Sequence, residues 1–600
     1  MTRAHLSRPA LAAPSFALIA ALLAAPPVAA EMPAGVSSFT LDNGLQAVVI
    51  EDHRAPVVVQ MVWYRIGSAD EVAGKTGLAH YLEHLMFKGT ETLAPGELSR
   101  TVTANGGSDN AFTSYDFTTY FQRIAADRLP LVMRMEADRM ANLRIGEDDW
   151  QAERQVVLEE RAQRTDSDPA ALFGEEVAAV QFYNHPYGRP VIGWRAEMEG
   201  LTRADALDWY ESHYAPNVAV LVVAGDVTAD EVRKLAEEHY GPIPAKPGAE
   251  RQARPQEPAK RAERRMEMRD PRVPQPVLTR STVAPERNPG DQETAAALSV
   301  LAELLGGSAQ TSVLGRELML TGKAVYAGAR YDGLSVDPTT FALTVVPAPG
   351  VPQDEAERML DDAIAKFLRD GPDEAALERV RTGLRAARIY EQDSAHGRAY
   401  DYGQGLAVGL SVEDVNDWPD ILARVTAEDV MAAAALVLEG RPGVTSWLLP
   451  AEGATVAQGA PVGSAAADPA AADPAATPAG RGMADPADLS GDTPAANAGE
   501  PAAPVGPADI PAPDAGAAAP VPDASTGDTP APGTSAPGTF APGTPPPGTP
   551  SPDTPTPETP APPDPVAHPV ADPVAAPADA VPPVGAPVER QPSPQPEQQP

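Results

Sequence analysis

Apolar residues in the first part of the chain alternate between the spacing of strands and the spacing of amphipathic helices. Residues 57–64 (VVVQMVWY) are rich in β-branched and aromatic side chains, which is typical of a buried strand. Asn43-Gly44 stands between two short apolar runs, residues 39–41 and 45–50. This dipeptide favours a tight turn, so the sequence predicts an opening β-hairpin.

The same alternation divides the chain into domains. We expect an N-terminal domain over residues 36–245 and a second domain over residues 277–450. Between them, residues 246–276 are rich in proline, arginine and glutamate without apolar periodicity, which indicates a linker. Residues 451–600 hold 38 of the 68 prolines and a repeated Pro-Gly-Thr motif. Such a tail buries too little apolar surface to offset its ordering entropy, so it is predicted to be disordered.

The two predicted domains resemble each other in sequence pattern. Residues 201–224 and 425–449 each indicate a helix followed by a strand, and each helix opens with a threonine three residues before an aspartate, as in a capping arrangement. A second likeness pairs residues 219–240 with residues 342–368. We interpret the halves as two copies of one α+β domain, the alternative being a chance likeness between common patterns.

The first 30 residues have the features of a secretory signal peptide. Arg3 and Arg8 precede an apolar run over residues 16–25, and residues 28–30 (VAA) supply a small-residue cleavage site. The run is short for a bilayer span, although an uncleaved anchor is the alternative. No later segment has the roughly 18 apolar residues of a spanning helix. We therefore expect an exported chain, periplasmic or secreted, with no transmembrane helix once mature.

Charge and cysteine content exclude several classes of protein. The net charge is −37; the tail, with 18 acidic and 2 basic residues, carries −16 and the rest of the chain −21. This argues against nucleic-acid binding, which requires a cationic surface. The chain has no cysteine, so any metal must be held by nitrogen and oxygen ligands.

Residues 77–87 (GLAHYLEHLMF) contain the most informative motif. On a helix, at about 100° per residue, His80 and His84 fall within about 40° of each other, and Glu83 lies between the same turns. Two such imidazoles can bind one cation, and the carboxylate can accept a proton from a water molecule on that cation. The H-x-x-E-H spacing is a signature of metallopeptidases. A pair of surface histidines is the alternative, but the apolar neighbours predict a buried helix.

A catalytic zinc also needs a third protein ligand and an open fourth position. On a predicted second helix, Glu153, Val156, Val157 and Glu160 share one face, and Glu159 points about 100° away. An acidic side chain on a core-facing valine stripe is unfavourable unless it binds something. We therefore predict Glu160 as the third ligand, Glu153 as a group that supports the ligands, and Glu159 as a solvated charge. An ordinary charged amphipathic helix is the alternative.

Residues 77–90 (GLAHYLEHLMFKGT) resemble the active-site helix of the pitrilysin and insulinase family of zinc metallopeptidases, most closely its smaller, mitochondrial-processing-peptidase-like members. Residues 153–160 are similar to the stretch that holds the family's glutamate ligand, and the separation of 76 residues between His84 and Glu160 fits the family. The resemblance covers about residues 36–450. It implies one Zn²⁺ per chain and two homologous α/β-sandwich domains that form half of a clamshell.

Residues 105–114 resemble the edge strand that, in the family, adds the substrate backbone to a sheet, with Asn110 and Ala111 beside the cleavage point. The family's second domain carries an arginine and a tyrosine about seven residues apart that bind substrate carbonyls. Here Arg316 and Tyr326 are ten residues apart. Either they bind substrate, or a partner subunit does so, or they are a helix-surface arginine and a core tyrosine.

These observations lead to a functional hypothesis. The chain is predicted to be a zinc endopeptidase acting on extended or unfolded polypeptides, with Glu83 moving a proton from water to the leaving amine. The resemblance implies a homodimer, or a heterodimer with a related subunit that lacks the zinc motif. A non-catalytic peptide-binding or scaffolding subunit of the same fold is the alternative, and the complete zinc motif argues against it. An enzyme that matures one specific peptide or cofactor precursor is a further alternative.

Overall fold

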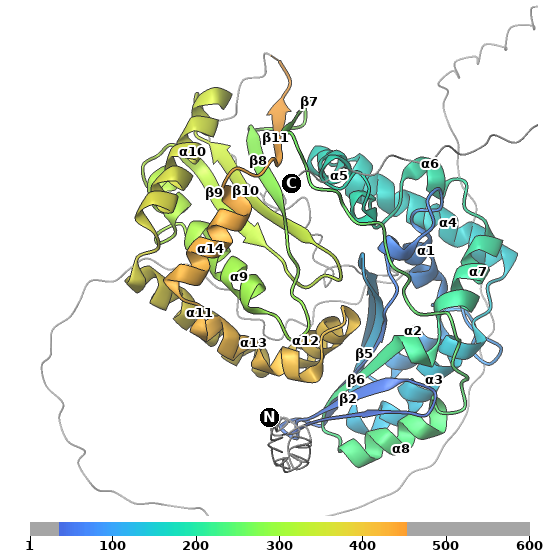
Figure 1. Cartoon of the computed structure of the whole chain (residues 1–600). Helices are drawn as coiled ribbons and strands as arrows, with labels where there is room; N and C mark the ends of the chain where they lie inside the picture. The colour runs from blue at the N-terminus through green and yellow to red at the C-terminus, as the bar shows by residue number, and fades with distance from the viewer. Residues whose placement is uncertain (1–34, 453–600) are drawn as a thin grey trace, which may run out of the picture. The chain divides into compact units, whose positions relative to one another are not determined.

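The computed structural model describes residues 35–452, which form two mixed β-sheets with helices packed against them (Figure 1). The predicted signal peptide and nearly all of the predicted tail lie outside the described residues. Within residues 35–452, no helix is both long and apolar enough to cross a membrane.

The first sheet has the strand order β1-β2-β6-β3-β5-β4. Its strands are β1 (Val36–Thr40), β2 (Gln46–Glu51), β3 (Val57–Tyr64), β4 (Ser108–Thr113), β5 (Thr118–Ala125) and β6 (Ala219–Gly225). β1 and β2 are antiparallel and are joined through Gly44, whose φ of 89° suits glycine, so the predicted hairpin is confirmed. β3 is a buried inner strand, as its sequence predicts. β4 pairs with β5 alone among the described strands and forms one edge of the sheet.

The second sheet has the strand order β7-β11-β8-β10-β9. Its strands are β7 (Arg264–Asp270), β8 (Val277–Ala284), β9 (Ala324–Tyr331), β10 (Thr339–Pro347) and β11 (Val444–Pro450). β7 falls inside the segment predicted to be a linker and runs parallel to β11, so that segment contains a strand that its composition did not indicate. The strand has alternately exposed charges and half-buried side chains, which hides its periodicity among arginines and glutamates.

Apart from β1, which belongs to the first sheet alone, the two sheets have the same topology, and this supports the interpretation as a tandem repeat. Taken in chain order, β2 to β6 and β7 to β11 occupy matching places, and both series show one parallel and three antiparallel pairings. α7 (Arg203–His213) precedes β6 and α14 (Ala427–Leu438) precedes β11, each with the predicted threonine–aspartate capping box. The second likeness, residues 219–240 with 342–368, was wrong: β6 matches β11, whereas β10 matches β5.

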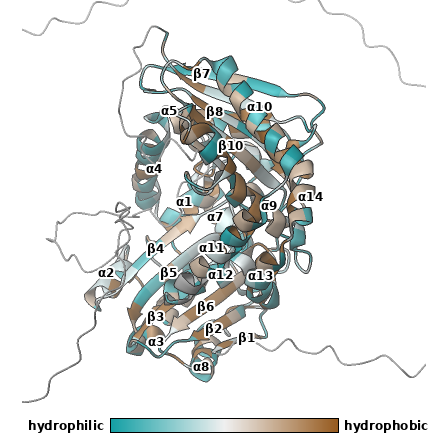
Figure 2. Ribbon diagram, turned by 90° about the vertical axis from the view of Figure 1, so that its left-hand side faces the viewer, coloured by the Kyte–Doolittle hydropathy of each residue, from teal (hydrophilic) through white to brown (hydrophobic). Residues whose placement is uncertain are grey.

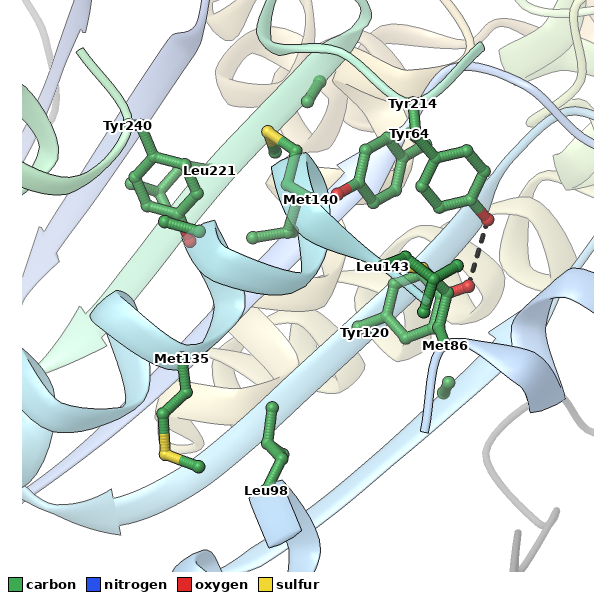
Figure 3. Packing of buried hydrophobic residues seen from close by; sticks show 14 of the residues in the cluster. Tyr64, Met86, Leu98, Tyr120, Met135, Met140, Leu143, Tyr214, Leu221 and Tyr240 are labelled. Atoms are coloured by element: carbon green, nitrogen blue, oxygen red, sulfur yellow. Dashed lines mark hydrogen bonds between the residues drawn. The ribbon is translucent and has the colours of Figure 1, made fainter. Parts of the chain in front are cut away.

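One face of the first sheet packs against a layer of helices. The layer contains α1 (Leu78–Leu85), α3 (Leu129–Asn142), α4 (Glu147–Arg161), α7 and α8 (Ala229–His239). Figure 3 shows part of this core, in which the hydroxyl groups of Tyr120 and Tyr214 are hydrogen-bonded at 3.0 Å and the Tyr64 ring lies against the Tyr214 ring. This aromatic group joins β3, β5 and the end of α7, and so fixes the sheet beneath the helix that carries the histidines.

The opposite face of the first sheet is covered by a helix from late in the chain. α12 (Ala395–Ala407) packs on β3 and β6, where Trp63 is fully buried against Tyr400. α13 (Val412–Arg424) follows it and contributes to this core and to that of the second sheet. The domain predicted over residues 277–450 therefore contributes α12 and the first part of α13 to the core of the first sheet.

The second sheet has its own helical layer, formed by α9 (Glu293–Gly306), α10 (Gln353–Asp370), α11 (Glu374–Gln392) and α14. Figure 2 draws α9 largely in brown and α4 largely in teal, because α9 consists mainly of alanine, leucine and valine whereas α4 is rich in charged residues. The remaining α-helices of the described residues are α2 (Glu97–Ala104), α5 (Pro169–Gln181) and α6 (Arg195–Met198).

Candidate active site

The helix with the H-x-x-E-H motif is short and entirely buried. α1 spans eight residues, and Gly77 at its start adopts a φ of 89°. The buried Glu71 side chain accepts hydrogen bonds from the backbone N–H groups of Gly77 (3.0 Å) and Ala79 (2.7 Å). Burial raises the pKa of Glu71 to about 8, and these two donors oppose that rise. Glu71 thus satisfies helix-start donors that would otherwise be buried without a partner, a role that no capping motif in the sequence indicates.

The structure brings the three predicted metal ligands together. Nε2 of His84 lies 3.2 Å from Glu160 Oε2, and Nε2 of His80 lies 3.8 Å from Glu160 Oε1. One ligand atom from each residue lies within 4.8 Å of the others. α4 thus delivers its carboxylate to the two imidazoles of α1, as the sequence predicts from the face that Glu160 occupies.

The chemistry of the three side chains fits a divalent cation. Burial and the neighbouring His84 lower the pKa of His80 to about 4, which keeps this imidazole neutral, as a ligand must be. Burial would raise the pKa of Glu160, but the two histidines lower it to about 2, so it is a carboxylate. His80 Nδ1 is buried without a hydrogen-bond partner among the described residues, whereas Glu160 Oε1 forms an ion pair with Arg164. Two imidazoles and one carboxylate are a ligand set that zinc accepts.

His84 lies in a negative field that favours a cation. Burial opposes a charge on its ring, yet hydrogen bonds to Glu153 and Glu160 raise the pKa of His84 to about 10. A metal ion on Nε2 would satisfy the same two carboxylates while the imidazole stays neutral. The electrostatics therefore favour a positive charge at the position where the three ligand atoms converge.

Glu153 contacts the His84 ring on the side opposite Glu160. Its Oε1 lies 2.9 Å from His84 Nδ1, and its other oxygen forms an ion pair with Lys88. A carboxylate on Nδ1 holds the imidazole in the tautomer that leaves Nε2 available to a metal. The sequence predicted a supporting position for Glu153. It did not reveal Lys88, which follows the motif by four residues.

Glu83, the predicted general base, lies on the same helix as the two histidines. Its Oε2 accepts a hydrogen bond from Thr113 Oγ1 at 2.6 Å, and its Oε1 is buried without a partner among the described residues. Burial raises the pKa of Glu83 to about 7, although His84 and Thr113 oppose the shift. A carboxyl group with a pKa near neutrality suits proton transfer in both directions.

The face of α4 differs in one respect from the prediction. Val157 is fully buried, but Val156 is 49% exposed, so the valine stripe is narrower than the helical spacing indicates. Glu159 is exposed, as predicted. Beyond Arg161 the helix continues as a π-helical turn over residues 162–166, from which Arg164 forms an ion pair with Glu160. Such turns are frequent at functional sites.

Three of the four predicted substrate-binding residues lie on edge strands of the two sheets, and the fourth, Arg316, lies in a helical turn. Asn110 and Ala111 are on β4, where Ala111 is fully buried and Asn110 is half-buried. Tyr326 is half-buried on β9, the counterpart of β4, and Arg316 is exposed in the π-helical turn Gly315–Met319. Substrate binding by these four residues stays a prediction.

Comparison with known proteins gives the class. Residues 46–194 match the family model described as insulinase (peptidase family M16), and residues 200–384 match the model described as the peptidase M16 inactive domain. An uncharacterized zinc protease of Mycobacterium leprae is 32% identical over 430 residues, which are 68% of this chain and 91% of that protein. The zinc protease PqqE of Helicobacter pylori is 37% identical over 204 residues, 34% of this chain and 46% of that protein.

Solved structures agree with this relationship. The crystal structure of a protease from Helicobacter pylori superposes with a TM-score of 0.65 at 27% identity, and the match covers 69% of this chain and 99% of that one. The chain therefore belongs to the insulinase family of zinc metallopeptidases, as the resemblance in the motif predicts, and zinc is its cofactor.

Proposed function

We propose that the chain is a zinc metalloendopeptidase in which His80, His84 and Glu160 hold the metal and Glu83 is the general base. The convergence of three ligand atoms within 4.8 Å carries this proposal: two come from α1, which also holds the buried Glu83, and one comes from α4. The family domain described as inactive matches residues 200–384. We therefore assign the chemistry to the first domain, which holds the complete motif.

The mechanism follows from the groups around the motif. Bound zinc would supply Lewis acidity toward the scissile carbonyl and toward a water molecule. Glu83 takes a proton from that water and gives it to the leaving amine, and a pKa raised to about 7 by burial suits both steps. Glu153 and Lys88 keep His84 oriented while charge develops at the site.

The substrate of this reaction is an extended stretch of polypeptide. β4 forms an edge of the first sheet and stands directly against α1. A peptide that adds to this edge pairs through its backbone. The site would therefore select substrates by their extended conformation more than by their sequence. Asn110 and Ala111 would then lie beside the scissile bond. Arg316 and Tyr326, from the second domain, are the candidates for contacts with substrate carbonyls.

We also propose that the protein is exported and works as a dimer. The basic, apolar and small-residue segments before Glu31 support cleavage after Ala30, which N-terminal sequencing of the protein from the periplasmic or extracellular fraction would test. The pairing of chains is a homodimer, or a heterodimer with a subunit that lacks the zinc motif. Light scattering that finds an active monomer would contradict it.

Digestion of a mixed library of unstructured peptides tests the peptidase activity. Wild-type protein with zinc should cleave internal bonds, and Glu83→Gln should retain the metal and lose most of the activity. Glu159→Gln, on the exposed face of α4, should be as active as wild type. Cleavage by Glu83→Gln at the wild-type rate would refute the base, and an inactive wild type with bound zinc would favour the peptide-binding alternative.

A further inference from the structure

The last residue of β4 connects the edge of the sheet to the general base. Thr113 Oγ1 donates a hydrogen bond of 2.6 Å to Glu83 Oε2. Among the described residues, this is the one side-chain hydrogen bond to the Glu83 carboxylate, because Oε1 has no hydrogen-bond partner there. One strand therefore carries both the predicted substrate contacts and the residue that holds the base.

The direction of this hydrogen bond is set by the next strand. Thr118 faces Thr113 across the hairpin, with the two hydroxyl oxygens 3.5 Å apart, and it donates to the carbonyl oxygen of Ile66 at 3.2 Å. A threonine hydroxyl has a single proton. The short contact to a buried carboxylate is much the stronger of the two contacts of Thr113, so its proton goes to Glu83.

The backbone of Thr113 faces the open edge. The N–H of Ser114 donates to the carbonyl of Phe117 at 2.8 Å and closes the hairpin between β4 and β5. Hydrogen-bonded and non-hydrogen-bonded pairs alternate in an antiparallel ladder. The pairing of β4 with β5 has no register shift, so Thr113 and Ala111 are in non-hydrogen-bonded pairs. Their peptide groups therefore point away from β5, toward the edge where a further strand would pair.

We propose that Thr113 is a positioning residue of the peptidase: it binds Oε2 of Glu83, assigns proton transfer to Oε1, and couples the pairing of substrate on β4 to the orientation of the base. This inference rests on the proposed function. A strand added to the edge fixes the Thr113 backbone, and the side chain of the same residue transmits that order to Glu83. A carboxylate without this contact is free to rotate, and small displacements of a reacting group slow a reaction strongly.

Two substitutions separate the hydrogen bond from the shape of the side chain. Thr113→Val is nearly isosteric and removes the donor, and we expect kcat to fall about 10- to 100-fold with KM changed by less than about twofold. Thr113→Ser keeps the hydroxyl and should stay within about threefold of the wild-type kcat. Thr103→Val, at an exposed position of α2, is the matched control and should equal wild type.

Zinc content and wild-type activity make the outcomes distinguishable. All variants should bind zinc like the wild type, and an inactive wild type or an active Glu83→Gln would refute the proposed function, not the role of Thr113. With those controls in order, a Thr113→Val protein with the wild-type kcat would overturn the inference. So would a Thr113→Ser protein as slow as Thr113→Val, or a Thr113→Val protein in which KM alone rises.

Discussion

His84 and Glu153 form a hydrogen bond of 2.9 Å between Nδ1 and a carboxylate oxygen, and this contact directs Nε2 of the ring toward Glu160, 3.2 Å away. The ring is therefore oriented by the fold itself, through α4, on which Glu153 and Glu160 are seven residues apart. α4 supplies both Glu160, the proposed ligand, and Glu153, which orients the ring of His84, so the site is preorganised for a metal.

Removal of the Glu153 carboxylate should weaken metal binding. In Glu153→Gln, the amide can still contact His84 but no longer favours a charged or metal-bound ring, and its ion pair with Lys88 is lost. We expect zinc affinity to fall about 10- to 100-fold in a competition titration with a chelator. Glu159→Gln is the control and should bind like wild type. Equal affinities for Glu153→Gln and wild type would contradict this role.

Glu71 should contribute to stability through the start of α1. Glu71→Ala leaves the buried N–H groups of Gly77 and Ala79 without their acceptors. Since each buried unsatisfied donor costs about 1–3 kcal/mol, we expect the unfolding free energy in urea to fall by about 2–4 kcal/mol. Glu97→Ala removes a comparable contact, to the N–H of Ala94, at the surface and should cost about 1 kcal/mol or less. Equal losses in the two variants would contradict the prediction.

The packing of α12 on the first sheet should be sensitive to a single methyl group. A Cβ added at Gly403 would lie 2.0 Å from Trp63 Nε1, whereas one added at Gly383 on α11 meets nothing within 4 Å. Gly403→Ala should therefore destabilise the protein by about 1–3 kcal/mol through overpacking. Gly383→Ala should be neutral or stabilising by up to about 1 kcal/mol, because alanine favours a helix. Thermal or urea unfolding of both variants measures the difference.

A buried group of ions should make stability sensitive to acid. Arg254 contacts Asp70 (2.9 Å), Asp116 (2.5 Å) and Asp337 (3.0 Å), and His185 lies 3.2 Å from Asp337. Burial would raise the pKa of Asp337, but His185 and Arg254 together lower it to about 2. The folded state thus binds its proton less readily than the unfolded chain, where the pKa is about 3.9.

Asp337→Asn tests this linkage. The wild type should exceed the variant in unfolding free energy above about pH 4, because the ionised carboxylate is stabilised in the fold. As the pH falls from 4 through 2, the wild type should lose that advantage and the two values should converge. Urea unfolding of both proteins as a function of pH measures the gap. A gap that stays constant from pH 7 to pH 2 would contradict the assignment.

Local pattern was enough to predict much of the fold. The Asn43-Gly44 hairpin, the buried strand at residues 57–64 and the threonine–aspartate caps depend on residues close in sequence, and all are present. The helical spacing of His80, Glu83 and His84 likewise requires only one helix. Glu160 could be predicted as a ligand because it shares a helix face with the buried Val157, where a carboxylate is unfavourable unless it binds something.

The rest depends on contacts that no local pattern contains. Thr113 reaches Glu83 across 30 residues, and Arg254 reaches Asp70 across 184. Both contacts exist only after the sheets have formed, and Glu71 likewise has no cap-like spacing to α1. Val156 was misassigned because helical periodicity gives an angle but not the extent of the neighbouring surface. α12 packs on the other sheet because Gly403 lets it approach Trp63, and sequence order does not indicate that pairing.

Anomalous scattering at the zinc absorption edge, measured on crystals of the zinc-loaded protein, tests the metal site most directly. We predict one strong peak per chain at about 2.0–2.2 Å from a ring nitrogen of His80, from Nε2 of His84 and from a carboxylate oxygen of Glu160. The same peak should be absent in Glu160→Gln crystals grown with limiting zinc. A zinc peak elsewhere on the wild-type chain, with none between these three side chains, would contradict the proposed site and the peptidase mechanism built on it.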